Sequence, residues 1–181
     1  MMDMKVENIV ATTTIGKELN LEKIASTVAG SKYEKERFPG LIMHIDEPKT
    51  TYLLFKNGKV VSLGAKSEEE LRAGIQKLCE KLVESGFEVS FESEIAIKNV
   101  VASSDLCVEM NLTNMVLALG LENVEYESEQ FPGLVYWLEE SRAVFLIFNS
   151  GKIICLGTKS PEEASKAIDT LSSKLHSLRL I

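Results

Sequence analysis

The chain is poor in residues that build covalent or metal-bound frameworks. It has three cysteines and two histidines, and Cys79, Cys107 and Cys155 form no close pair. Such spacing supports neither a disulfide framework nor a zinc knuckle, and no carboxylate or cysteine accompanies His44 or His176 at ligand spacing. We therefore expect three free, buried thiols, solvated or capping histidines, and no metal or cofactor.

Long hydrophobic runs are also missing. No stretch approaches the roughly 20 consecutive apolar residues of a membrane-spanning helix, and residues 1–5 lack the basic, then apolar, build of a signal peptide. The sequence therefore predicts a soluble, intracellular protein with no membrane partner. Its 45% hydrophobic residues are enough to bury a core.

Basic charge is in short supply as well. Twenty Lys and Arg stand against 27 Asp and Glu, which gives a formal net charge of −7. Nucleic-acid binding draws on basic side chains. A basic face can nevertheless coexist with acidic helices, so the distribution of charge decides whether nucleic acid is a partner.

The sequence does contain an internal repeat. Phe38-Pro39-Gly40-Leu41 recurs 93 residues later as Phe131-Pro132-Gly133-Leu134. Asn8-Ile9-Val10-Ala11 matches Asn99-Val100-Val101-Ala102 at an offset of 91, so two residues are inserted near Gly120 to Val124. We expect two tandem copies of one unit, residues 1–92 and 93–181.

Each copy predicts the same order of elements. A strand (6–14; 97–104) leads to a short helix with Asn20 or Asn111 as its N-cap. Strands near 32–37, 41–45, 50–56 and 59–64 follow, with counterparts 93 residues later. A capping box, Ser67 with Glu70 or Ser160 with Glu163, opens a long helix. The apolar stripe of this helix faces a core and comprises Leu71, Ile75, Leu78 and Leu82, or Ala164, Ile168, Leu171, Leu175 and Leu178.

The hairpin strands are apolar on both faces, since Leu53 and Phe55 alternate with Tyr52 and Leu54. Two helices per copy can cover only one face of such a sheet. The other face stays apolar, and by parity it includes Asn8, Val10 and Thr12, with Asn99, Val101 and Ser103 as the duplicate set. A homodimer or sheet-on-sheet packing are alternative ways to bury it.

Amides and small hydroxyls among methyl groups suit a flat partner that offers acceptors. The minor groove of A·T-rich DNA is such a partner. Lys59 and Lys152 share the parity of the apolar face, and Lys49 and Arg142 lie in neighbouring turns, where they could reach phosphates.

These motifs resemble the TATA-binding protein family, especially its archaeal branch, over nearly the whole chain. They are the duplicated N-[IV]-V strand, F-P-G-L, L-x-F before x-G-K, and G-x-K-S opening each long helix. The resemblance implies an α+β fold in which two pseudo-symmetric repeats form one curved, ten-stranded antiparallel saddle with four helices on the convex face. It also implies a general transcription initiation factor that binds the TATA box in the minor groove and kinks it.

The resemblance assigns roles to residues of both copies. It implies intercalation by Phe38, Phe55, Phe131 and Phe148, and base contacts by Asn8, Val10, Leu53, Val61, Leu63, Asn99, Val101, Leu146, Ile154 and Leu156. It implies phosphate contacts by Arg37, Lys49, Lys59, Arg142, Ser150 and Lys152. Leu63 and Leu156 depart from the family, which usually has threonine there.

The segments before the two Phe-Pro-Gly motifs differ in charge. The first mixes bases with acids, whereas the second has Glu125, Glu127 and Glu129 and no base. Because two near-identical halves read a nearly palindromic site, another feature must set direction. We hypothesise that the acidic segment recruits a basic partner, which the resemblance names as transcription factor B. RNA polymerase would follow indirectly, at the nucleoid in the cytoplasm of an archaeal cell or in a eukaryotic nucleus.

Two other classes of function are weighed. An enzyme is disfavoured because the sequence has no His-Asp-Ser order, no glycine-rich phosphate loop, and acid pairs only at helix starts. A protein-binding scaffold, with a partner chain on the apolar face, is the main alternative. A free chain could also form a homodimer through this face.

Overall fold

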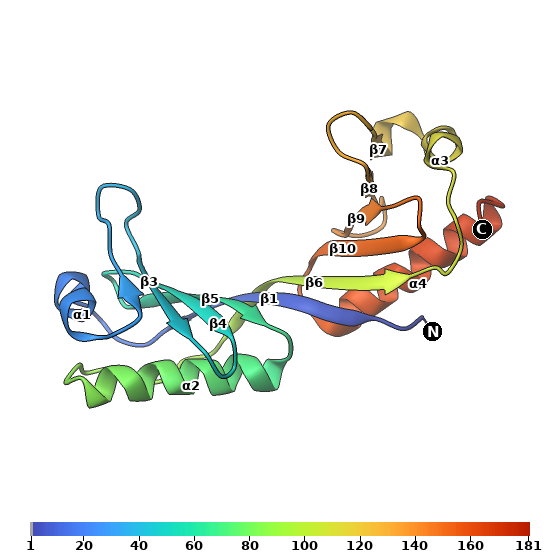
Figure 1. Cartoon of the computed structure of the whole chain (residues 1–181). Coiled ribbons are helices and arrows are strands. Elements are labelled where there is room, and N and C mark those ends of the chain that lie inside the picture. The colour runs from blue at the N-terminus through green and yellow to red at the C-terminus, as the bar shows by residue number, and fades with distance from the viewer. Residues whose placement is uncertain (1) are drawn as a thin grey trace. The chain divides into compact units, whose positions relative to one another are not determined.

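Residues 2–181, which the computed structural model describes, form four α-helices and ten strands (Figure 1). The first repeat contains β1 (Lys5–Thr14), α1 (Leu21–Thr27), β2 (Ser31–Lys32), β3 (Leu41–Ile45), β4 (Thr50–Leu54), β5 (Lys59–Ala65) and α2 (Glu68–Glu84). The second contains β6 (Ala96–Asp105), α3 (Leu112–Leu119), the 3₁₀ helix η1 (Leu121–Asn123), β7 (Val124–Glu125), β8 (Leu134–Trp137), β9 (Val144–Ile147), β10 (Lys152–Thr158) and α4 (Pro161–Ser177).

The chain divides into two compact units that share β1. One unit is Asn8–Lys98, and the other is Asn99–Ile181 together with the N-terminal residues up to Glu7. The strand order is β2-β3-β4-β5-β1 in the first repeat and β6-β10-β9-β8-β7 in the second, with antiparallel pairing. The predicted α+β class, with ten antiparallel strands in two like-ordered repeats, is confirmed. The repeat boundary at 92/93 stays a prediction.

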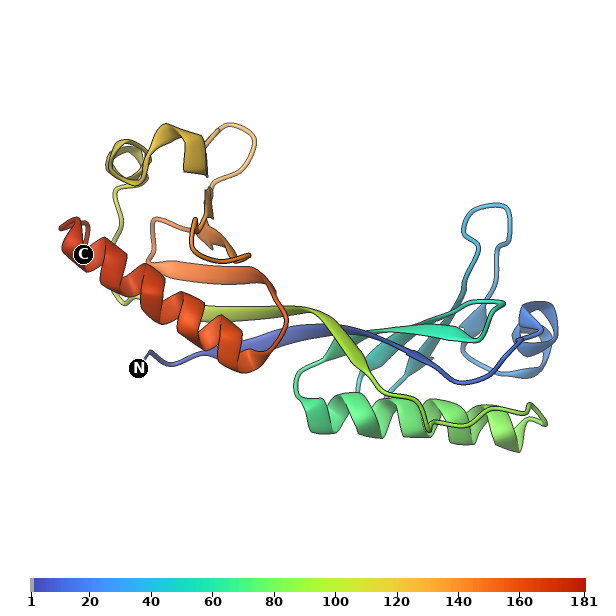
Figure 2. The same ribbon diagram turned by 180° about the vertical axis from the view of Figure 1, so that it is seen from behind.

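One long helix covers one face of the strands in each unit (Figures 1 and 2). Each begins at the predicted cap: the Ser67 hydroxyl accepts the Glu70 N–H at 3.0 Å, and the Ser160 hydroxyl accepts that of Glu163 at 3.0 Å. The predicted stripe is buried in both helices, except for Leu178. That prediction was wrong because α4 ends at Ser177, which leaves Leu178 39% exposed.

The predictions for the short helices are confirmed, but those for the loops after them are confirmed only in part. The Asn20 and Asn111 side chains cap α1 and α3 as predicted, and the inserted residues fall in and around η1. The strand expected over 32–37 was wrong beyond Lys32. The Glu34 carbonyl accepts the N–H groups of Arg37 and Phe38, which turns the chain and ends the strand pairing.

A matched pair of contacts shows how each helix is fitted to its sheet. Gly74 of α2 lies against Tyr52, and a Cβ at Gly74 would collide with the Tyr52 hydroxyl. The counterparts 93 residues later are Ala167 and Phe145, both buried. Because phenylalanine lacks the hydroxyl, the second repeat has room for the alanine methyl.

Candidate nucleic-acid interface

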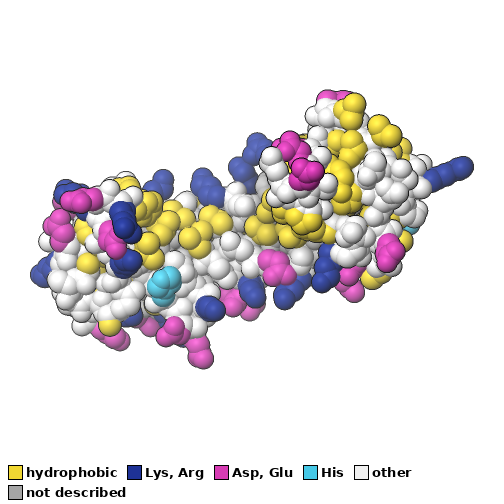
Figure 3. Space-filling view, turned by 45° about the horizontal axis from the view of Figure 1, so that its top comes forward, with side chains coloured by type: hydrophobic (Ala, Val, Ile, Leu, Met, Phe, Trp, Pro, Cys, Tyr) yellow, Lys and Arg dark blue, Asp and Glu magenta, His cyan; other side chains and the backbone are white. Residues whose placement is uncertain are grey.

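The sheet face opposite each long helix carries half-buried, mostly apolar side chains. The strand register aligns them in a row across β3, β4, β5 and β1 in the first repeat and across β8, β9, β10 and β6 in the second. Hydrophobic side chains gather in each half of the view in Figure 3, with Lys and Arg at their margins. We call these rows the central rows. They comprise Ile42, Leu53, Val61 and Thr12, and Val135, Leu146, Ile154 and Ser103.

The predicted base-contacting residues all lie half-buried on this face. Val10 and Val101 alternate with the buried neighbours Ile9 and Val100 on β1 and β6. Leu63 and Leu156 lie one step along the strands from the central rows, opposite Thr51 and Val144 respectively. Their methyl groups add apolar surface and offer no hydroxyl.

The two asparagines present their amides in a fixed direction. The Asn8 Oδ1 accepts the backbone N–H of Gly64 at 2.6 Å, and the Asn99 Oδ1 accepts that of Gly157 at 2.8 Å. Gly64 and Gly157 have φ of 97° and 87°, at register shifts between the paired strands. Since each carbonyl oxygen is occupied, the NH₂ group remains to donate. Each repeat therefore offers an oriented donor beside apolar side chains.

The four phenylalanines form two edge-to-face pairs. The ring centroids are 5.9 Å apart for Phe38 and Phe55 and 5.8 Å apart for Phe131 and Phe148. None is sunk in the core, and Phe131 is 39% exposed. Each pair sits directly over a glycine, because a Cβ at Gly40 or Gly133 would lie 2.7 Å from the Phe38 or the Phe131 ring. The glycine of each F-P-G-L motif thus makes room for the rings.

The predicted cations are exposed in both repeats. Lys59 and Lys152 precede the central rows at the starts of β5 and β10, where Asn57 Oδ1 and Ser150 Oγ accept their backbone N–H groups at 3.1 and 3.4 Å. Lys49 and Arg142 occupy the turns after β3 and β8. Arg37 is paired with Glu34 at 3.4 Å, which lowers the charge it could offer a phosphate.

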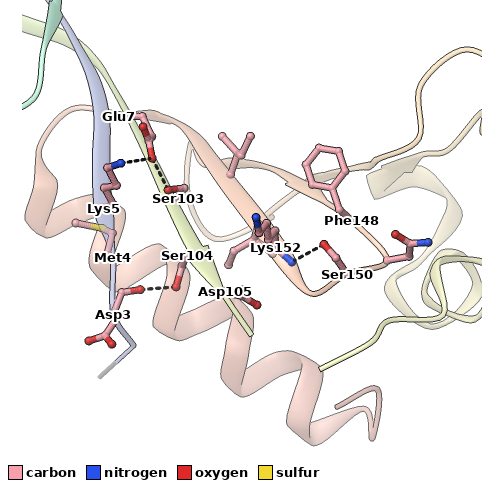
Figure 4. Close-up of a pocket in the computed structure, with 13 residues that line it drawn as sticks. Asp3, Met4, Lys5, Glu7, Ser103, Ser104, Asp105, Phe148, Ser150 and Lys152 are labelled. Atoms are coloured by element: carbon pink, nitrogen blue, oxygen red, sulfur yellow. Dashed lines mark hydrogen bonds and ion pairs between the residues drawn. The ribbon is translucent and has the colours of Figure 1, made fainter. Parts of the chain in front are cut away.

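A hollow of about 760 Å³ lies beside Phe148, Ser150 and Lys152 in the second repeat (Figure 4). Asp3, Glu7 and Asp105 line its other side. The Ser103 hydroxyl donates to Glu7 Oε1 at 2.8 Å, so it is not free to donate to a ligand. Carboxylates on this side disfavour phosphate, so an anion would lie toward Ser150 and Lys152.

The acidic segment of the second repeat is exposed at Glu125, Glu127 and Glu129. The Glu127 carbonyl accepts the N–H groups of Gln130 and Phe131, the same turn as at Glu34. In the first repeat Lys32 pairs with Glu34 at 3.1 Å, whereas among the described residues these three glutamates make no ion pair. Residues 99–141 contain eight acidic residues and no basic one, against six acidic and five basic in 8–48.

The cysteines are buried as predicted, with one exception. Cys79 and Cys155 are buried, but Cys107 is exposed in the loop after β6, so the expectation of three buried thiols was wrong. Burial raises the pKa of the Cys79 thiol to about 11 and that of the Cys155 thiol to about 12. Within residues 2–181 no group of three His, Cys, Asp or Glu is placed to hold a metal, and no helix is long and apolar enough to cross a membrane.

The sequence reasoning missed two sets of residues. Gly40 and Gly133 were noticed as a motif but not as the space beneath the rings. His44, near the end of β3, and Trp137, at the end of β8, were not assigned to the open face. Strand alternation could have placed His44 and Trp137 on the open face, because they lie two residues from Ile42 and Val135 of the central rows. The repeat had already paired Gly40 with Gly133, but sequence spacing does not show which side chains cover them.

Comparisons with known proteins identify relatives of this chain. The family model described as Transcription factor TFIID (or TATA-binding protein, TBP) matches residues 3–85 and 94–178. The TATA-box-binding protein of Archaeoglobus fulgidus is 47% identical over 178 residues, covering 98% of this chain and 97% of the relative. That of Thermoplasma acidophilum is 47% identical over 176 residues, covering 97% and 96%.

A solved structure extends the likeness to the fold. Methanococcus jannaschii TBP superposes with a TM-score of 0.88 at 41% identity, covering 97% of this chain and 99% of that one. Both repeats, the open sheet face and the paired phenylalanines fall within the matched residues. The chain therefore belongs to the TATA-binding protein family of transcription factors.

Proposed function

We propose that this protein binds A·T-rich promoter DNA of the TATA-box type through the open sheet faces of its two repeats. The single observation that carries the proposal is the oriented asparagine amide in each repeat. A·T pairs present acceptors in the minor groove, at adenine N3 and thymine O2, whereas G·C pairs add the guanine N2 donor. A face that offers NH₂ donors among methyl groups matches the first pattern and opposes the second.

The paired phenylalanines supply the means to deform the duplex. Phe131 and Phe148 form an apolar, edge-to-face pair, and Phe38 and Phe55 form its counterpart. Minor-groove proteins insert apolar wedges between base steps and kink the duplex, and this family is one of the standard examples of that behaviour. The exposed Lys59 and Lys152, beside the central rows, would hold flanking phosphates.

A mobility-shift experiment with two duplexes of equal length tests this function. We expect retention of an A·T-rich duplex at protein concentrations that leave a G·C-rich duplex free. Equal retention would indicate binding through phosphates alone. No retention of either duplex would favour the protein-binding scaffold, with a partner chain or a second copy on the open face.

We further infer that the acidic segment recruits transcription factor B, and through it RNA polymerase. Glu125, Glu127 and Glu129 are exposed, and the stretch 99–141 supplies no base to neutralise them. Unpaired carboxylates attract a basic surface and steer its approach. This segment lies outside the central rows, so recruitment and DNA binding can be separated by mutation.

Reversing the charge at Glu127 and Glu129 to lysine should weaken the ternary complex with transcription factor B and leave the binary DNA complex intact. Both complexes can be followed on one gel. Glu68→Lys with Glu69→Lys, on the exposed first turn of α2, is a control with the same change in net charge. Unchanged recruitment by the Glu127/Glu129 variant would refute the role of the segment.

A further inference from the structure

The two open faces differ in polarity at a pair of neighbouring, repeat-related positions. His44 ends its row on β3 beside Thr51, whose Oγ1 is 3.0 Å from His44 Nδ1. The counterparts 93 residues later are Trp137 and Val144, paired on β8 and β9. Trp137 is 44% exposed. A polar pair in the first repeat is thus replaced by an apolar pair in the second.

The strand register places these positions beside the walls of a bound groove. Open-face residues two apart on a strand are separated by about 6.6 Å, similar to the minor-groove width of about 6 Å. If the central rows lie on base edges, the rows through His44 and Trp137 lie over sugars and phosphates. The neighbouring turns carry Lys49 and Arg142, which suits the same placement.

We propose that Trp137 and His44 are unequal contacts to the DNA backbone that set the orientation of the protein on its site. Trp137 packs its ring on the apolar face of a deoxyribose. His44, held through Nδ1 by Thr51, donates from Nε2 to a phosphate. The inference rests on the proposed DNA binding and goes beyond it. Lys49 and Lys59 have basic counterparts in the second repeat and cannot distinguish one half-site from the other, and Arg37 is already paired with Glu34.

Trp137 is the chain's single tryptophan, so its emission reports on this position alone. Saturating A·T-rich duplex should shift the emission to shorter wavelength as water leaves the ring. Anisotropy of a dye on the DNA, read in the same sample, measures binding independently. Full binding with unchanged tryptophan emission would overturn the inference and leave the proposed function standing, whereas absence of binding would count against both.

Orientation is tested on a palindromic A·T-rich duplex with neutral methylphosphonate linkages at one end. The exposed Cys107 can carry a DNA-cleaving reagent, because the buried Cys79 and Cys155 keep their protons at pH 8. We expect the Trp137 half to settle on the neutral end, with cuts biased about fivefold toward it.

The matched variant exchanges the two pairs: His44→Trp and Thr51→Val with Trp137→His and Val144→Thr. The exchange keeps the amino-acid composition and the net charge. It also leaves Arg37 unchanged, so any change in the bias comes from the exchanged pairs. We expect the bias to be lost or reversed, measured at protein concentrations that saturate the duplex for both proteins. Equal cutting by the natural chain, or a bias that the exchange leaves intact, would overturn the proposal.

Discussion

At the scale of single residues, one hydrogen bond of each asparagine side chain fixes the direction in which its other polar group points. The Gly64 and Gly157 N–H groups hold the asparagine carbonyls, so the amide nitrogens face outward. The sequence predicted Asn8 and Asn99 as donors through family resemblance. It could not show why these side chains are oriented. Their orientation depends on a glycine with positive φ at a register shift, where two strands far apart in sequence pair.

Replacing Asn8 or Asn99 with aspartate tests this arrangement with almost no change of shape. The remaining oxygen still accepts the glycine N–H, but the donor becomes an acceptor that faces acceptors. We expect each change to weaken binding to an A·T-rich duplex by about tenfold to a hundredfold, measured by fluorescence anisotropy. Asn114→Asp, which adds the same charge to the exposed first turn of α3, is the control. Equal losses in control and variant would show that net charge alone is responsible.

The glycine under each phenylalanine pair is tested by Gly133→Ala. A methyl group there would lie 2.7 Å from the Phe131 ring and 2.9 Å from Phe148, so the rings must move. We expect DNA affinity to fall by about tenfold. Gly16→Ala is the matched control, since its Cβ would meet no atom closer than 3.7 Å. If the same titration shows undiminished affinity for Gly133→Ala, the position of the phenylalanine rings does not control DNA binding.

At the scale of elements, strong local signals were read correctly and weak ones were not. The capping boxes, the asparagine caps and the alternation of β3, β4 and β5 fixed those elements from sequence. A strand was predicted over residues 32–37, yet the Glu34 carbonyl accepts two N–H groups and makes a turn. The local sequence does not distinguish a strand from a turn here, because these residues are compatible with both.

The fit between helix and sheet makes a prediction about α2. Gly74→Ala should lower the free energy of unfolding by about 1–3 kcal/mol, because the new methyl group collides with the Tyr52 hydroxyl. Adding Tyr52→Phe recreates the Ala167 and Phe145 combination of the second repeat and should restore most of the loss. Urea unfolding measures both. A double variant no more stable than Gly74→Ala would show that the hydroxyl is not the cause.

At the scale of the whole molecule, the two repeats present similar faces that differ at particular positions. The acidic stretch 99–141 and the Trp137 and Val144 pair both belong to the second repeat. The net charge alone argued against nucleic acid, but the charge is unevenly distributed. Acidic side chains cluster in the first turns of α2 and α4 and in the stretch 99–141, while the open faces carry lysine at their margins. The sequence predicted this separation because the repeat aligns the two halves.

The most direct test of the central claim compares A·T, I·C and G·C duplexes of one design. Inosine lacks the guanine 2-amino group, so an I·C pair presents acceptors without a donor in the minor groove, while its major groove resembles that of G·C. Our account predicts that the I·C duplex binds nearly as tightly as A·T and that G·C binds far more weakly. Binding of I·C no tighter than that of G·C would contradict readout of the minor groove by this face.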